Sequence, residues 1–487
     1  MLKQITLSLL AAGVLGGCSL APTLQRPEAP VAATFPQEAA PTGIAAPATP
    51  AANAGTPAAD IGWQDFFPDR RLQAFIAAAL DNNRDLRTAA LRIEEARAQY
   101  NIQSADLLPT LNAAGGVTRS RTPGELNASG RPILTTGYQV GLSLTSFELD
   151  FFGRVRSLNQ AALAQYLATE EAARAARISL VAETAKAYLA ERSFAEQHEL
   201  ARQTLQGREN GYRLAQQRFE VGASSALDLR QNETLVLTAR ATLATLARQR
   251  AQAINALTLL VGRPLDTIGD LPAPQPLSGQ NIVNDIPAGL PSDLLVRRPD
   301  IRAAEQRLVS ANANIGAARA AFFPRISLTA AFGTASTALS GLFSAGSGNW
   351  SFGPQLLLPI FDSGRNQGNL DLAQVRTNLA VVDYEKTIQT AFREVSDALT
   401  ARGYLEEQIE AQRAVQVAQA DRLKLADQRF RNGISSSLDV LDAERELFSA
   451  QQSLVQAQLL RLTNSVDLYR SLGGGLKSTT NYASQAR

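Results

Sequence analysis

The chain has 487 residues, 45% of them hydrophobic, and its 47 basic and 45 acidic residues give a formal net charge of +2. This balance argues against a nucleic-acid partner, which would require a basic stripe. With one histidine, His198, and one cysteine, Cys18, the sequence supplies neither a Cys/His metal cluster nor a nucleophile paired with histidine. A carboxylate-only enzyme is conceivable, but no motif marks one, so we expect no enzyme, no cofactor and no bound metal.

The amino terminus is typical of a bacterial lipoprotein. A basic residue precedes an apolar stretch, residues 5–15, that is too short to span a bilayer. The stretch ends in the lipobox-like sequence LGGC, which predicts a signal peptide over residues 1–17 and lipid attachment at Cys18. The alternative is an ordinary secretory signal that happens to contain a cysteine. Residues 18–60 are rich in Pro and Ala, which predicts a lipid-anchored extended tether, and Ser19 in place of aspartate favours outer-membrane sorting.

Two β-hairpins are predicted, at about 110–147 and about 325–359. In the first, Tyr138, Val140 and Leu142 alternate with small or polar residues, and the second repeats this period of two. Polar, glycine-containing loops separate the strands of each hairpin. The alternation fits a membrane strand, but it also fits a soluble sheet with one wet face.

Two very long helices are predicted, at about 154–220 and about 365–431. Neither stretch contains proline, and both are rich in Ala, Leu, Gln, Glu and Arg, which are strong helix formers. About 65 residues at 1.5 Å rise make a helix on the order of 100 Å long, too long for an ordinary globular domain. Each is followed by a shorter return helix, at about 225–261 and about 436–472.

An internal repeat organises the chain. The segment RFEVGASSALDL is matched by RFRNGISSSLDV, which pairs Gly222 with Gly433, and similar matches precede the hairpins. Each half therefore reads as a helix, a β-hairpin, a long helix, a tight turn and a return helix. The predicted parts are a first repeat at 61–262, a connector or equatorial segment at 263–291, a second repeat at 292–475 and a tail at 476–487.

Four strands cannot form a closed membrane structure on their own. Open sheet edges are not tolerated in lipid, and the smallest known membrane barrels have eight strands. If the strands cross a membrane, several chains must share one barrel with an even strand count. The alanine-rich long helices also require several chains, because they permit close helix packing but supply no hydrophobic core within one chain.

Several long motifs resemble the outer-membrane factors of tripartite efflux pumps, an OprM-like group within the TolC superfamily. The resemblance runs from Cys18 to about residue 475 and is carried by CSLAPTLQRPEAPV, ELDFFGRVRS, AGLPSDLLVRRPDIRAAEQRLVSANANIGAARAAFFPRISLTA and DYEKTIQTAFREVSDAL. It implies a mixed α and β membrane protein. Its homotrimer would build a twelve-stranded outer-membrane β-barrel, four strands per chain, that continues as a long periplasmic α-helical barrel. The N-terminal segment, the connector and the C terminus would form a collar.

The function that this resemblance implies is a passive exit duct of a multidrug efflux pump in the outer membrane of a Gram-negative bacterium. Its partners would be outer-membrane lipid, a periplasmic adaptor (membrane fusion) protein and an inner-membrane RND transporter. One alternative is an outer-membrane channel for metal or protein export. More distant alternatives are a structural periplasmic helical lipoprotein and an enzyme or binding module on a helical scaffold.

The two turns between long and return helices are expected to contact the adaptor, because they lie at the helix ends farthest from the strands. The alternative is that their glycines act only as turn formers. The expected contact residues are Val221, Gly222, Ser224, Asn432, Gly433 and Ser435.

Three residues just past the second turn match, position for position, the family's constriction residues. Leu438, Asp442 and Arg445 lie four and three residues apart, which places them on one helix face. In a trimer each would form a ring of three, and the carboxylates would repel unless arginines such as Arg445 or Arg230 bridged neighbouring helices. The alternative is a solvated charged face. Two weaker candidates for this periplasmic gate, aligned by the repeat, are Asp228 and Asp439.

Overall fold

The computed structural model describes residues 20–35, 56–126, 128, 130–283, 286–287 and 289–480. The candidate lipid-attachment residue Cys18 and most of the predicted tether lie outside the described residues. The chain divides into two compact units. We call the first the sheet unit, with the described parts of 1–28, 92–170 and 303–385. We call the second the helical unit, with the described parts of 29–91, 171–302 and 386–487.

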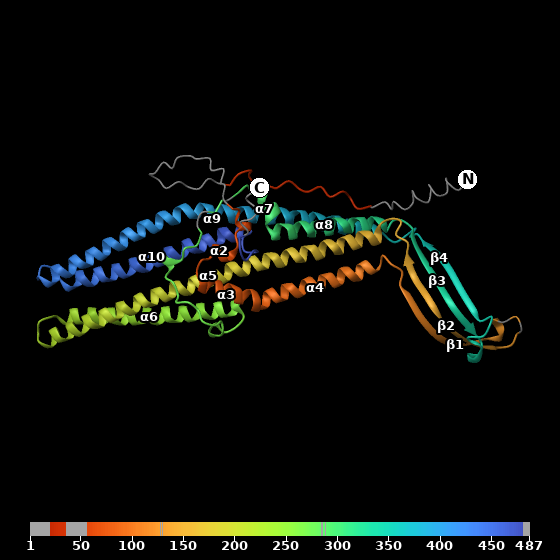
Figure 1. The fold of residues 1–487 in the computed structure, drawn as a ribbon, viewed down its shortest axis with the longest axis horizontal. Coiled ribbons are helices and arrows are strands. Elements are labelled where there is room, and N and C mark those ends of the chain that lie inside the picture. Colours follow the sequence, from red (N-terminus) through yellow and green to blue (C-terminus); the bar gives the residue numbers. More distant parts are fainter. Residues whose placement is uncertain are drawn as a thin grey trace. The chain divides into compact units, whose positions relative to one another are not determined.

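The sheet unit contains a four-stranded antiparallel sheet in the order β1-β2-β3-β4 (Figure 1). Its middle pair, β2 and β3, joins the two halves of the internal repeat, and β1 and β4 are the edge strands. Among the residues that the structure describes, no strand pairs with the outer side of either edge strand. The strands are β1 (Leu111–Thr122), β2 (Ile133–Glu148), β3 (Arg325–Ser336) and β4 (Gly348–Leu357).

The two faces of the sheet differ in polarity. Residues that pair directly across neighbouring strands share a face. One face carries apolar side chains in register, such as Ala113, Leu142, Phe332 and Trp350. The other carries small and polar ones in register, such as Asn112, Ser143, Ala331 and Ser351. The large apolar side chains Leu142, Phe332 and Trp350 are exposed in the single chain, so this apolar face is not covered by the described residues.

Helices make up most of the remaining chain. The two longest, α5 and α9, have 67 residues each. Each starts just after a glycine with positive φ, Gly153 or Gly364, which turns the chain out of the preceding loop. None of the described helices is long and apolar enough to cross a membrane. The helices are α2 (Trp63–Phe66), α3 (Arg70–Asn82), α4 (Arg84–Ala105), α5 (Arg154–Glu220), α6 (Ala226–Val261), α7 (Pro291–Arg297), α8 (Pro299–Ala320), α9 (Arg365–Arg431) and α10 (Ser437–Ser471).

The N-terminal segment and the C-terminal tail pack together in the helical unit. The Phe66 and Tyr469 rings stack with centroids 3.9 Å apart, and both side chains are buried. The Tyr469 hydroxyl donates a hydrogen bond to the Ile61 carbonyl at 2.7 Å. Close by, the Trp63 N–H donates to the Lys477 carbonyl at 3.0 Å. The stacked rings therefore join α10 to the start of the first repeat, and the Trp63 hydrogen bond holds the tail beside them.

The connector is tied to the same region by a buried carboxylate, Asp69. It accepts hydrogen bonds from the Tyr188 hydroxyl at 2.7 Å, from Gln280 Nε2 at 2.8 Å and from the Arg71 N–H at 2.8 Å. The last of these caps α3, Tyr188 belongs to α5, and Gln280 belongs to the connector. Burial and the hydrogen bond to Asp69 raise the pKa of Tyr188, so this phenol stays protonated. Asp69 thus joins three segments that are distant in sequence.

The start of the predicted tether is held against α8 within the sheet unit. Arg26 forms an ion pair with Glu305. Further along α8, Asn312 Nδ2 donates to the Pro22 carbonyl at 2.8 Å. Residues 20–30 contain no helix or strand, as expected for an extended segment, but these contacts show that its first part is docked.

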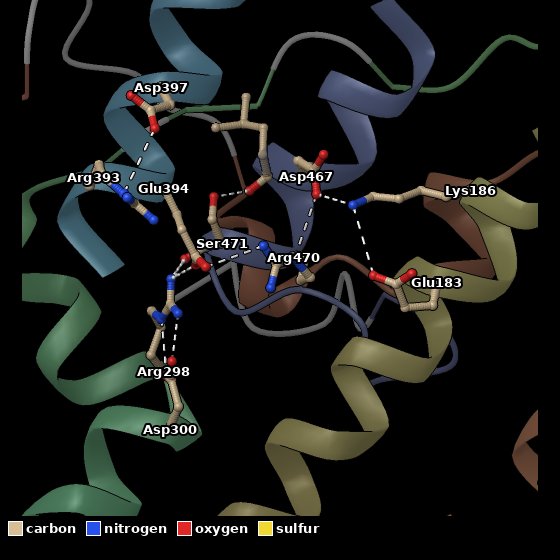
Figure 2. Close-up of polar contacts among 11 residues, drawn as sticks. Glu183, Lys186, Arg298, Asp300, Arg393, Glu394, Asp397, Asp467, Arg470 and Ser471 are labelled. Carbon is tan, nitrogen blue, oxygen red and sulfur yellow. Dashed lines mark hydrogen bonds and ion pairs between the residues drawn. The ribbon is translucent and has the colours of Figure 1, made fainter. Parts of the chain in front are cut away.

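In each repeat a hydrogen bond joins the start of one helix to the end of another. In the first, Asn83 Nδ2 donates to the Leu260 carbonyl at 2.9 Å. In the second, Arg298 Nη1 donates to the Ser471 carbonyl at 3.0 Å (Figure 2). These positions correspond in the internal repeat. The donor of the first hydrogen bond is a neutral amide, and the donor of the second is a cationic guanidinium.

Arg298 therefore needs counter-charges, and it has two. It pairs with Asp300 at 2.5 Å and with Glu394 at 2.9 Å, and Glu394 also pairs with Arg470 at 3.4 Å (Figure 2). Burial alone would lower the pKa of Arg298, but its hydrogen bonds and charge interactions with Asp300 and Glu394 raise it above the ordinary arginine value. Figure 2 shows the network continuing through Asp467 to Lys186 on α5.

We predict that Arg298→Gln destabilises the protein. The Arg298 side chain is 8% exposed, and its loss leaves Glu394 without its closest partner. Breaking such a pair should cost about 3 kcal/mol, the lower end of the usual range, because Asp300 is partly exposed. The matched control is Arg393→Gln, one position from Glu394, whose side chain is 71% exposed and 4.0 Å from Asp397. Thermal unfolding midpoints of the purified variants should separate clearly, and equal midpoints would contradict the role of Arg298.

Candidate functional site

The two turns that end the long helices have the same backbone geometry. At the end of α5 the Ala223 N–H donates to the Arg218 carbonyl at 2.7 Å, and the Gly222 N–H donates to the Phe219 carbonyl at 3.0 Å. The corresponding bonds follow α9, where Gly433 replaces Gly222. This is the Schellman pattern, which needs a left-handed residue, and both glycines have φ of 72°. No atom lies within 4 Å of a Cβ built on either glycine, so only the backbone conformation demands glycine here.

The predicted tip residues do not all point into solvent. Val221, Gly222, Asn432 and Gly433 are exposed, Val221 to 78%. Ser224 and Ser435 are half-buried, and the Ser224 hydroxyl lies 3.5 Å from the Ala215 carbonyl. The exposed part of each tip is therefore the turn itself, and Ser224 points toward α5 of its own hairpin.

Asp228 and Asp439 act first as helix caps. The Ser225 N–H donates to Asp228 Oδ2 at 3.2 Å, and the Asp228 N–H donates back to the Ser225 hydroxyl at 3.1 Å. The hydrogen bonds from Ser225 lower the pKa of Asp228, which keeps the carboxylate ionised beside the helix N-terminus. In the second repeat the Ser436 N–H donates to Asp439 Oδ2 at 3.2 Å. Sequence reasoning had not assigned this capping role to either aspartate.

Four of the six predicted gate residues line one groove of about 370 Å³ between α6 and α10. Leucines supply its apolar part, and charged and uncharged polar residues supply the rest. Asp228 and Asp439 do not line it. Its lining residues are Leu227, Arg230, Gln231, Thr234, Leu235, Leu438, Leu441, Asp442 and Arg445.

Asp442 is the electrostatic centre of this groove. Arg422, on the neighbouring helix α9, approaches its Oδ2 at 2.6 Å, and Arg445 approaches its Oδ1 at 2.5 Å. All three side chains are at least one-third exposed, so each pair is worth only about 0–1 kcal/mol. Arg230 pairs instead with Glu233 on its own helix at 2.5 Å. Within one chain, the bridge between helices is therefore made by Arg422 rather than by Arg445 or Arg230.

Arg422 was missed in the sequence, although a signal for it existed. In an antiparallel helical hairpin, residues at similar distances from the turn face each other. Arg422 lies eleven residues before Gly433 and Asp442 lies nine residues after it. The predicted hairpin therefore brings the two residues to a similar distance from the turn, but it does not specify which α9 residue faces Asp442.

A buried charge lies behind the groove. Arg208 on α5 is 7% exposed, and its Nη1 donates to the carbonyl of Leu235, a groove residue, at 3.2 Å. Its guanidinium lies 6.0 Å from the centre of the Phe448 ring on α10. Burial lowers the pKa of Arg208 and raises that of Glu444, also on α10. The side of α10 that faces Arg208 therefore carries poorly solvated charged groups, whereas the side that lines the groove carries exposed ones.

Comparison with known proteins identifies the family. The family model described as outer membrane efflux protein matches residues 75–263 and 290–474. The chain belongs to the outer membrane efflux protein family. It is 49% identical to outer membrane protein OprJ of Pseudomonas aeruginosa, covering 96% of this chain and 95% of that one. It is also 47% identical to the probable efflux pump outer membrane protein TtgC of Pseudomonas putida, covering 100% and 98%.

Solved structures agree with this assignment. The open-state MtrE outer-membrane channel of Neisseria gonorrhoeae aligns with a TM-score of 0.84 at 43% identity, covering 95% of this chain and all of that one. A membrane protein from Pseudomonas aeruginosa aligns with a TM-score of 0.85 at 48% identity, covering 94% of this chain and all of that one. The chain is therefore an outer-membrane efflux channel protein of the Gram-negative type. The expected fold class is confirmed for the single chain, which is mostly helical with a four-stranded sheet.

Proposed function

We propose that three copies of this chain assemble into the passive exit duct of a tripartite multidrug efflux pump. Each copy contributes four strands to one twelve-stranded outer-membrane barrel, and the helices of the three copies form the periplasmic barrel. The duct supplies no energy, so cargo moves down its gradient from an inner-membrane RND transporter. The proposal extends the family assignment from the single chain to an assembly.

The sheet is the observation that carries this proposal. Its apolar face bears exposed residues such as Phe332 and Trp350, which suits contact with lipid acyl chains. Its small, polar face suits a water-filled lumen. The outer sides of β1 and β4 carry backbone groups that lipid cannot satisfy, so β1 of one copy is proposed to pair with β4 of the next.

The two exposed turns are proposed as the contact with a periplasmic adaptor protein. They are rigid, because each is closed by Schellman hydrogen bonds, and they present Val221 and Ile434 to solvent. Each is separated from the sheet in sequence by a helix of 67 residues. The names of two relatives refer to efflux of antibiotics and of toluene, which supports these two classes of compound as candidate cargo.

Lipid attachment at Cys18 is a further part of the proposal. The docking of residues 20–26 on α8 supports it, since this docked segment begins two residues after Cys18. The intact mass of protein from native membranes should exceed that of the polypeptide starting at Cys18 by its acyl groups. An unmodified mass would contradict the anchor.

The groove around Asp442 is proposed as the gate. In the trimer its charged pairs form a ring, and individually weak pairs can hold a closed state that yields to a partner with higher affinity for the open one. We predict that Asp442→Ala or Arg445→Ala raises single-channel conductance in planar bilayers and sensitises cells to large antibiotics such as vancomycin. Losing about 0.5 kcal/mol in each of three copies would shift the closed-to-open ratio by about tenfold.

The control is Glu410→Ala, which removes a similar exposed pair with Arg413 on α9, away from the groove. Its conductance should equal that of the unmodified protein. If both gate variants form trimers with unchanged conductance, the constriction lies elsewhere. If the unmodified protein conducts no ions, the duct itself is refuted.

For the adaptor contact, we predict that a bulky residue at Ser224 or Ser435, such as Ser→Trp, abolishes efflux while the trimer persists. Both serines are half-buried beside the exposed turn, so a large side chain must displace it. Resistance of cells to pump substrates measures efflux, and gel migration of the trimer controls for folding. Normal resistance in both variants would argue against docking at these turns.

A further inference from the structure

The charged residues of the two hairpins are confined to one region. Between residues 111 and 147 the charged side chains are Arg119, Arg121, Glu125 and Arg131, and between residues 326 and 361 there are none. All four belong to the loop end of the first hairpin. This end therefore carries an excess of two positive charges per chain.

Two of these arginines extend from the apolar face of the sheet. Arg119 and Arg121 lie on β1 two and four residues beyond Val117, so all three share one face. Val117 pairs with Tyr138, and Arg119 pairs with Thr136 on the next strand. Along β1 the apolar residues therefore end at Val117, and two exposed cations about 7 Å apart follow, the second of them opposite Leu134 on β2.

No carboxylate of the hairpins neutralises these cations. Among the described residues, neither Arg119 nor Arg121 has an ion-pair partner, and Glu125 is the one acidic residue of both hairpin loops by sequence. The loop between β3 and β4, residues 337–347, has no charge. A neighbouring copy pairing its β4 with this β1 would thus bring an uncharged loop to the two arginines.

The other end of the sheet is different. There Arg325 pairs with Glu148 at 2.6 Å, and Arg154 pairs with the same carboxylate at 2.7 Å. The arginines at the end joined to the helices therefore have a carboxylate partner, whereas Arg119 and Arg121 have no ion-pair partner among the described residues.

We propose that Arg119 and Arg121 bind the phosphate groups of the phosphorylated glycolipid (lipid A) of the outer leaflet. This rests on the proposed function, which puts the apolar face in lipid and the hairpin loops outside the cell. Tyr138 then lies at the boundary of the acyl chains, and the arginines lie at headgroup level. The planar guanidinium matches phosphate with two parallel hydrogen bonds, and basic side chains at the membrane surface attract anionic headgroups.

Native mass spectrometry of the purified full-length protein in detergent tests this site. The probes are lipid A with both phosphates, dephosphorylated lipid A and phosphatidylglycerol. The double variant Arg119→Gln/Arg121→Gln should bind phosphorylated lipid A at least about tenfold more weakly than the unmodified protein. Arg119→Lys/Arg121→Lys should lose less, because it keeps the charge, and Arg325→Gln at the other end of the sheet should bind normally.

Three results would overturn the proposal: unchanged binding in the glutamine variant, equal binding of dephosphorylated lipid A, or equal binding of phosphatidylglycerol. Conductance of the same preparations keeps the two proposals separate. Normal conductance with unchanged lipid A binding refutes the lipid site alone. A protein that forms no conducting trimer refutes the duct on which the site depends.

Discussion

The unpaired edges of β1 and β4 are the constraint on which the rest of the structure depends. In water such edges cost little, but in lipid each unsatisfied N–H or C=O costs several kcal/mol. The apolar face shows that this sheet is suited to lipid, and four strands cannot close on themselves. In the proposed assembly, pairing with further copies would satisfy the edges and would make the proposed gate residues of each chain parts of a symmetric ring.

Strong and weak interactions are distributed unevenly along the helices. The hydrogen bonds and ion pairs of Asp69 and Arg298 are buried, so breaking them destabilises the folded chain. The turns are also firmly built, by Schellman bonds and by the Asp228 and Asp439 caps. The pairs of Asp442, by contrast, are exposed and individually weak. The proposed opening on contact with a partner would need this combination of rigid tips and a weakly held groove.

Much of the fold could be predicted because local signals agree with the final structure. The long helices lack proline and end at Gly222 and Gly433, whose left-handed conformation stops them. The pairing of β2 with β3 could not be predicted, since it joins strands separated by a whole repeat. The Arg298 network depends on the same long-range packing. Helix periodicity grouped Leu438, Asp442 and Arg445 on one helix face, and the structure places all three along one groove. The partner of Asp442 could not be predicted in this way, since it required knowledge of which α9 residue faces α10.

Electron cryomicroscopy of the purified protein in lipid nanodiscs would test the account most directly. The map should show three copies, with β1 of each chain hydrogen-bonded to β4 of its neighbour and the apolar face of the sheet turned toward lipid. A different number of copies, or an assembly in which β1 and β4 remain unpaired within the bilayer, would contradict it.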